Sequence, residues 1–189
     1  MADNLLFFTE LMDLPVLDLK GRRIGRVKDA ALVPLEHSSR IDRYLVGGGV
    51  TWLVIRHDQV RSISIDRGIE LSDEQLTPYH DDEYMLRISR DLLDQQIIDT
   101  NGRKVVRVND LTMEIRRQDG RDVVIVLEVD IGMRSILRRL LQGAVPPRWI
   151  RLLQQPIPPN SIRWELCNVI EPDPHRRLRL NISYERLEN

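Results

Sequence analysis

The side chains best able to do chemistry in this 189-residue sequence are carboxylates, and four of them recur in pairs. Asp18 and Asp29 are matched later in the chain by Asp99 and Asp110. Two carboxylates held together can act as general acid and general base. These aspartates flank expected turns, however, where an Asp side chain accepts hydrogen bonds from its own backbone. Their recurrence in two copies favours a structural role, because a duplicated active site is the rarer arrangement.

Two acidic clusters could hold a hard cation. One is Asp81, Asp82 and Glu83, and the other is Glu171 and Asp173. Mg²⁺ uses one or two carboxylates together with water, whereas Ca²⁺ needs several oxygen ligands at defined spacing, and no EF-hand spacing is present. The first cluster is typical of a solvated connector and the second of a rigid proline-rich loop. We therefore predict no cofactor and keep Mg²⁺ binding at these carboxylates as an alternative.

Other catalytic signatures are missing from the sequence. It contains no His-x-x-x-His, Cys-x-x-Cys, Gly-x-Ser-x-Gly or phosphate-loop lysine, and its four histidines are scattered. The single cysteine, Cys167, excludes an intramolecular disulfide and fits a reducing compartment. The triplet Gly47-Gly48-Gly49 favours a turn between strands, because β-branched residues resume at once. We predict that the chain is not an enzyme and has no catalytic residues.

Composition narrows the class of partner. Charged residues make up 30% of the chain, yet the formal net charge is −1, so bulk electrostatics does not select a nucleic acid. The N-terminal sequence has no signal-peptide pattern, and no apolar stretch approaches the roughly 18 residues of a membrane span. We expect a cytoplasmic protein, at the membrane if it is part of a transporter, with no span of its own.

The sequence contains one unit twice. Residues 17–29 align without a gap to residues 98–110, at a constant offset of 81, with six identities. In each copy a short strand leads into a turn at Gly21 or Gly102, and a second strand follows. Further short strands and turns follow in both copies, including a hairpin turn over residues 118–121. This pattern predicts a mainly β fold made of two small β-barrels in tandem.

The second copy carries an inserted helix, predicted near residues 133–142. Its apolar residues recur at helical spacing and form one stripe, while arginines occupy the other positions. The simplest interpretation is that the stripe covers the open end of the second barrel; the alternative is that it packs on a partner domain or an anionic membrane surface. The predicted interaction surface consists of Met133, Ile136, Leu137, Arg138, Leu140 and Leu141.

These features predict four parts of the chain. They are a first barrel over residues 1–76, an acidic linker over 77–86, a second barrel with its helix over 87–183, and a tail over 184–189 that leads to a further domain.

The hairpin sequence resembles that of the PRC-barrel family. The residues that carry the resemblance are Leu17-Asp18, Gly21, Ile24-Gly25 and Val27 to Asp29, and the second copy departs from the pattern at Val106, where the family has glycine. The tandem with a basic helix is more specifically similar to the N-terminal region of bacterial proteins that place two such barrels before an MgtE-type magnesium-transporter intracellular domain.

The resemblance implies a non-catalytic protein-interaction or regulatory module of a magnesium-transport-related protein. Its expected partner is another protein or the adjoining helical domain. A divalent-cation sensor arm is the alternative function, and a ribosome-maturation-like RNA-processing accessory is the second alternative. Near-zero net charge and few aromatic residues argue against the last.

Overall fold

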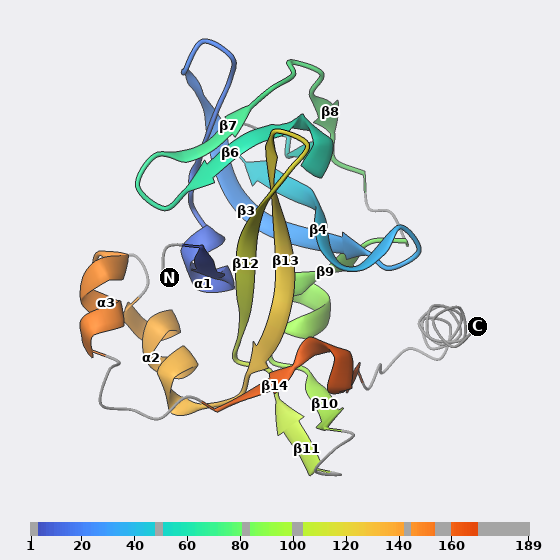
Figure 1. The fold of residues 1–189 in the computed structure, drawn as a ribbon, viewed down its shortest axis with the longest axis vertical. Coiled ribbons are helices and arrows are strands. Elements are labelled where there is room, and N and C mark those ends of the chain that lie inside the picture. The colour runs from blue at the N-terminus through green and yellow to red at the C-terminus, as the bar shows by residue number, and fades with distance from the viewer. Residues whose placement is uncertain are drawn as a thin grey trace.

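The computed structural model describes residues 4–47, 51–80, 84–99, 104–141, 145–153 and 160–169. Within these residues the protein is mainly β, as predicted. Twelve strands form one curled mixed sheet, and three more form a small separate sheet (Figure 1). Helical turns and two short helices lie around the sheet.

The first repeat contributes most strands of the large sheet. Its elements are β1 (Leu5–Phe7), α1 (Phe8–Leu11), β2 (Pro15–Leu17), β3 (Arg23–Val33), β4 (His37–Gly47), β5 (Leu53–Arg56), η1 (His57–Gln59), β6 (Val60–Ser64), β7 (Gly68–Leu71) and β8 (Thr77–Pro78).

The second repeat begins with an edge strand and a π-helical turn. Its elements are β9 (Leu86–Arg87), η2 (Ile88–Leu92), β10 (Gln96–Asp99), β11 (Lys104–Arg107), β12 (Asp110–Gln118), β13 (Arg121–Asp130), α2 (Met133–Leu141), α3 (Pro147–Leu153), β14 (Ser161–Arg163), η3 (Trp164–Leu166) and β15 (Cys167–Val169).

The predicted hairpins form. β2 pairs with β3 and β10 pairs with β11, both antiparallel, as the repeated motif predicts. Gly21 has a φ of 74° in the first turn, a conformation that favours glycine. Asp119 and Gly120 have φ values of 50° and 75°, which suits the two-residue turn that joins β12 to β13.

The prediction of two separate barrels is wrong. The order β1-β12-β13-β4-β3-β2-β7-β6 runs through both repeats, and Ile125 of β13 pairs with Arg40 of β4. The predicted acidic linker also enters the sheet at both ends, because β8 pairs with β5 and β9 pairs with β3. The two repeats are therefore fused into one folded unit.

The fusion is reciprocal, because the first strand of each repeat, here called its leading strand, pairs with a strand of the other repeat. β1 of the first repeat pairs with β12, with Leu6 opposite Met113. β9 of the second repeat pairs with β3, with Leu86 opposite Leu32. Met113 and Leu32 are equivalent positions at the offset of 81. The two leading strands therefore exchange places between the repeats.

Backbone hydrogen bonds confirm the duplication beyond the aligned segment. The Asp13 N–H donates to the Val27 carbonyl over 2.9 Å, and the equivalent Asp94 N–H donates to the Val108 carbonyl over 2.8 Å. Asp13 and Asp94 also share the same positive φ of 63°. The offset is 81 after the helical turns and 80 before them, because η2 holds one residue more than α1.

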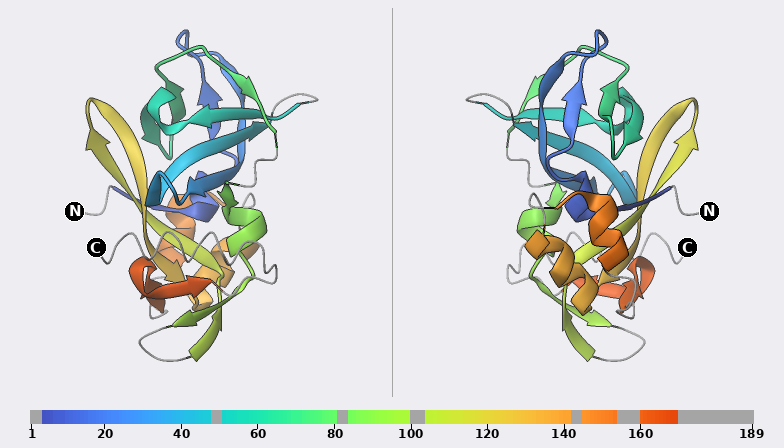
Figure 2. Two further views of the ribbon diagram at one scale, coloured as in Figure 1. Left: turned by 90° about the vertical axis from the view of Figure 1, so that its right-hand side faces the viewer. Right: turned by 90° about the vertical axis from the view of Figure 1, so that its left-hand side faces the viewer.

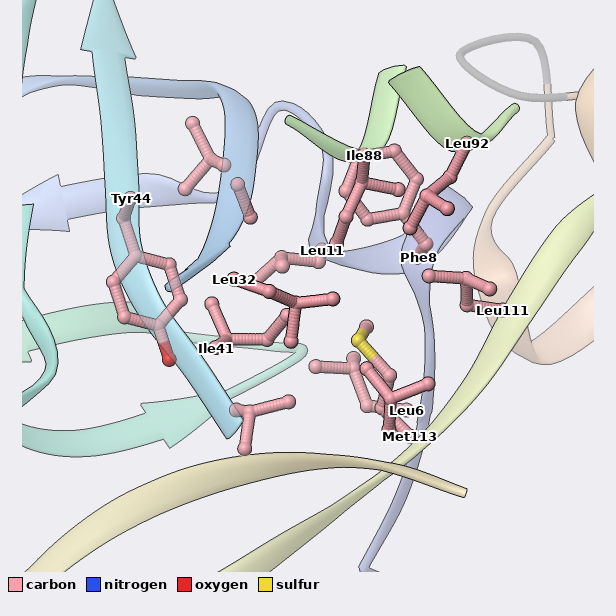
Figure 3. Close-up of a cluster of buried hydrophobic side chains, with 14 of the residues drawn as sticks. Leu6, Phe8, Leu11, Leu32, Ile41, Tyr44, Ile88, Leu92, Leu111 and Met113 are labelled. Carbon is pink, nitrogen blue, oxygen red and sulfur yellow. The ribbon is translucent and has the colours of Figure 1, made fainter. Parts of the chain in front are cut away.

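Side chains from both repeats share one hydrophobic core (Figure 3). Phe8 and Leu11 of α1 lie beside Ile88 and Leu92 of η2, and all four are fully buried. Leu6, Leu32, Ile41, Leu111 and Met113 belong to the same cluster. Because burial of apolar surface is the main stabilising contribution in folding, the repeats depend on each other for stability.

The departure from the family pattern at Val106 has a structural counterpart. A Cβ atom at the equivalent Gly25 would lie 2.7 Å from Val46 Cγ1 and 2.9 Å from the Gly47 carbonyl oxygen. Gly25 therefore lets β4 cross close to β3. At Val106 the chain is in β11, which pairs with β10 in the small sheet, and no other described strand pairs with it.

Some predictions concern residues outside those described. These are the carboxylates Asp81, Asp82, Glu83, Glu171 and Asp173, the turns at residues 48–49 and 100–103, and the tail over residues 184–189. Within the described part of the chain, no helix is long and apolar enough to cross a bilayer.

The reciprocal exchange predicts that neither repeat folds alone. A fragment of residues 1–80 lacks the strand β9, and a fragment of residues 84–189 lacks β1 and α1, so each loses an edge strand and part of the core. We expect the amide proton resonances of each fragment alone to be poorly dispersed, as in an unfolded chain. When the two fragments are mixed in equal amounts, we expect the dispersed resonances of a folded protein. A dispersed spectrum from either fragment alone would contradict the exchange.

Candidate interaction surface

The inserted helix α2 begins directly after β13, where the backbone is tightly packed. The Ile131 N–H donates to the Asn160 carbonyl over 3.0 Å, and a Cβ atom at Gly132 would lie 2.9 Å from Asn160 Cβ. The Ser135 hydroxyl donates back to the Gly132 carbonyl over 2.7 Å. These contacts fix the start of the helix against β14.

Arg138 is the residue that orients α2. Its side chain is only 4% exposed, and its guanidinium donates to Asp110 Oδ2 over 2.9 Å and to Asp130 Oδ2. The guanidinium carbon also lies 3.5 Å from the centroid of the Phe7 ring, in cation–π contact. Phe7 belongs to the exchanged strand β1, so Arg138 ties the insertion to both repeats.

The Asp110 carboxylate accepts hydrogen bonds from three parts of the chain. Its carboxylate is fully buried and accepts from the Leu111 N–H, the Thr9 N–H, the Thr9 hydroxyl and Arg138. Burial raises the pKa of the Asp110 carboxyl, and the Arg138 charge and these donors oppose that shift. Burial likewise raises the pKa of Asp130, with Arg138 opposing.

The first repeat builds the same arrangement around the equivalent Asp29. This buried carboxylate accepts from the Ala30 N–H over 2.8 Å and from the Ser89 N–H over 3.0 Å. Arg87 supplies the guanidinium, whose Nε lies 3.0 Å from Asp29 Oδ2 and whose carbon stacks near Tyr79 and Trp52. Each repeat thus combines a buried aspartate, a helical turn from the other repeat and an arginine beside an aromatic ring.

This arrangement supports the structural interpretation of the recurrent aspartates. Asp18 fits it as well, since its carboxylate accepts from the Lys20 and Arg22 N–H groups and from Arg22 Nε, all over 2.8 Å. These backbone and side-chain hydrogen bonds lower the pKa of Asp18. The side chain of Asp99 lies outside those described.

A second arginine of α2 makes an exposed ion pair. Arg139 donates to both carboxylate oxygens of Asp94 over 2.9 Å, and the two side chains are 36% and 52% exposed. The hydrogen bonds from Arg139 lower the pKa of Asp94. Asp94 follows η2, so this pair attaches the outer side of α2 to the start of the second repeat.

With Arg138 turned inward, three of the five apolar residues in the stripe of α2 are exposed to solvent. Met133 is 66% exposed, Leu140 is 75% exposed and Ile136 is also exposed, while Leu137 and Leu141 are partly buried. The simplest sequence interpretation, in which this stripe covers the end of a barrel, is therefore wrong. Arg138, predicted on the interaction surface, is buried instead.

A second helix enlarges the exposed apolar face. α3 begins at Pro147, a residue favoured in the first turn, and its Ile150 is buried. Its Trp149, Leu152 and Leu153 are each more than half exposed. α2 and α3 contact each other and lie side by side on one flank of the molecule (Figure 2). We call the exposed residues Met133, Ile136, Leu140, Trp149, Leu152 and Leu153 the α2–α3 face.

The sequence did not reveal the donors that pair with the two buried aspartates. Arg87, which pairs with Asp29, and Thr9, which pairs with Asp110, carry no motif, and their partners lie 58 and 101 residues away. The one available signal was the recurrence of Asp29 and Asp110, since a buried carboxylate requires a cationic or N–H partner. Elsewhere, the described residues contain no group of three or more potential metal ligands.

Arg138 and Arg139 of α2 differ in their predicted effects on stability. Arg138→Leu leaves the Asp110 carboxylate buried without its cation, and we expect it to lower the free energy of unfolding by about 3–5 kcal/mol. Arg139→Leu removes an exposed pair and is expected to cost less than about 1 kcal/mol. Urea unfolding of both variants measures the difference, and equal losses would contradict the central role of Arg138.

The Asp94–Arg139 pair predicts a pH dependence. The folded-state pKa of Asp94 lies below its unfolded value of about 3.9, so its contribution is present above that pH and is lost as the pH falls through the folded pKa. Because the pair is largely exposed, we expect Asp94→Asn to cost a few tenths to about 1 kcal/mol at neutral pH and nothing in acid.

Urea unfolding at a series of pH values tests this dependence. The matched control is Asp119→Asn, because Asp119 also has a positive φ, lies on an exposed turn, and forms no ion pair with the described residues. A loss from Asp94→Asn that persists unchanged in acid, or that Asp119→Asn reproduces, would contradict the prediction.

No family profile matches the chain, and no curated protein matches it either. The resemblance to PRC-barrels, noted from the hairpin residues, therefore stays a prediction.

Proposed function

We propose that this chain is a non-catalytic interaction and regulatory module that docks through its α2–α3 face. The observation that carries the proposal is the orientation of α2. The helix places an arginine in the protein interior and leaves Met133, Ile136 and Leu140 of its apolar stripe exposed. An apolar face held outward in this way is typical of a binding surface, because contiguous exposed apolar patches are uncommon on monomeric proteins.

The concentration of apolar residues supports this choice of surface. Among the described residues, 13 large hydrophobic side chains are exposed, and six of them fall on α2 and α3. The others are distributed over seven sites along the rest of the chain. Single exposed apolar residues are ordinary, so the cluster is the feature that needs an explanation.

The proposal also covers the type of the two repeats and the larger protein to which they belong. We propose that the two fused repeats are of the PRC type and that the chain is the cytoplasmic N-terminal part of a magnesium-transport-related protein. The hairpin residues around Gly21, Gly25 and Asp29 support this, as does the basic helix inserted in the second repeat. In this setting α2–α3 holds the fused repeats against a neighbouring surface and couples them to it. The cation-sensor and RNA-processing alternatives stay predictions.

Site-specific photocrosslinking in the producing cell tests the docking face. A benzophenone amino acid replaces Leu140 in the full chain, and the matched control carries it at Leu35, which is 56% exposed and lies outside α2 and α3. We expect a discrete crosslinked product from position 140, whether the partner is protein or lipid, and none from position 35. Equal yields at the two positions, or none at position 140, would refute the proposed docking face.

A further inference from the structure

The α2–α3 face is large enough to form most of one side of a protein interface. Its six side chains are between 38% and 75% exposed. At about 100 Å² for a large side chain that is half exposed, the face offers roughly 600 Å². Each partner in a standard protein complex buries about 800 Å². The face therefore supplies most of the area that one partner contributes to a stable complex.

The face gives no electrostatic preference for a charged partner. None of its six residues carries a charge. Beneath and beside it, Arg138 and Arg139 of α2 pair with three carboxylates, so these pairs leave no net positive charge on the helix side of the molecule. The carboxylates are Asp94, Asp110 and Asp130. The contacts that the face can make are apolar.

An uncharged apolar patch is complementary to a copy of itself. In a two-fold symmetric dimer the same patch lies on both sides of the interface, so its groups meet their own equivalents. Like charges in that position repel, whereas apolar side chains remove each other from water. Interfaces between identical chains are also more apolar than other protein interfaces. The leucine, isoleucine, methionine and tryptophan side chains of the face match that composition.

We infer that the α2–α3 face joins two copies of this chain in a symmetric dimer. The inference rests on the proposed function, whose docking face it uses, and it names the partner of that face. α2 and α3 lie side by side on one flank (Figure 2), so two copies would bring four helices together in one layer between two fused repeat units. Trp149 is the largest exposed side chain of the face and serves as its anchor, because tryptophan is enriched at the energetic centres of interfaces.

The anchoring of α2 keeps the face available for this contact. Arg138 is held by Asp110 and Asp130 beneath the helix, so α2 cannot roll to bury Leu140 without exposing these buried charges. The face is thus present before two copies meet, and dimerisation needs no refolding of α2. Because Arg138 also contacts Phe7 of the exchanged strand β1, the dimer contact is coupled to both repeats of each chain.

Sedimentation velocity of the 189-residue chain at a series of concentrations tests the inference. We expect a concentration-dependent species of twice the chain mass of 22.1 kDa. Because the contact is apolar, added salt should not dissociate the dimer, as it would a complex held by opposite charges. A chain that stays monomeric up to about 100 μM, or a dimer that salt dissociates, would overturn the inference.

Matched variants assign the association to the face. Leu140→Glu is expected to raise the dissociation constant of the dimer by at least about tenfold, because it removes an apolar side chain and by symmetry places two carboxylates in one interface. Leu35→Glu, the same change at another exposed leucine, is expected to leave the dissociation constant unchanged. Circular dichroism verifies that both variants are folded. A dimer that tolerates Leu140→Glu, or that Leu35→Glu weakens equally, would contradict the inference.

Tryptophan fluorescence gives a second measurement that does not depend on a disruptive variant. Dimerisation buries Trp149 and should shift the emission to the blue as the concentration rises. Trp149→Phe keeps the face apolar, so we expect it to remove this shift while Trp52 and Trp164 remain and the dimer persists. A shift that survives in Trp149→Phe would place the contact elsewhere and overturn the inference.

The remaining outcomes separate the two proposals. A monomeric chain, together with a crosslink from position 140 to a different protein or to lipid, would overturn the second copy as partner and leave the docking face standing. A monomeric chain with no crosslink would refute both proposals. A crosslinked product of twice the chain mass from position 140, and none from position 35, would support both.

Discussion

The buried carboxylate of Asp110 constrains more of this structure than any other group. A carboxylate taken out of water must find charged or N–H donors, or it destabilises the fold by several kcal/mol. Asp110 finds them in Leu111 of its own strand, in Thr9 of the exchanged helical turn and in Arg138 of the insertion. One side chain therefore fixes how β12 meets α1 and which side of α2 faces inward. Asp29 imposes the same requirement on the first repeat, with Arg87 as its cation.

The outward apolar face follows from that requirement. In the nine-residue helix α2, the inward side is occupied by Ser135 and by the charged side chain of Arg138. Met133, Ile136 and Leu140 are therefore left exposed, while Leu137 and Leu141 are partly buried. Electrostatic satisfaction of the core thus determines which surface the molecule offers to its surroundings.

Local patterns in the sequence predicted the local structure well. The repeated hairpin, the turn at Asp119-Gly120 and the helix over Met133–Leu141 all form, because strand alternation, turn glycines and helical spacing are properties of neighbouring residues. The tertiary arrangement was missed, since pairing of β1 with β12 joins residues more than 100 positions apart. The inward orientation of Arg138 was also missed. Helical periodicity separates apolar from polar residues, but it does not show that a buried carboxylate elsewhere in the chain pairs with one of the arginines.

The exchange of leading strands has a consequence for how such a chain can evolve. Each repeat takes an edge strand and donors for its buried aspartate from the other repeat. The loss or replacement of one repeat by recombination therefore removes a strand and those donors from the other. The two copies can diverge, as Val106 diverges from Gly25, but they are inherited as one unit.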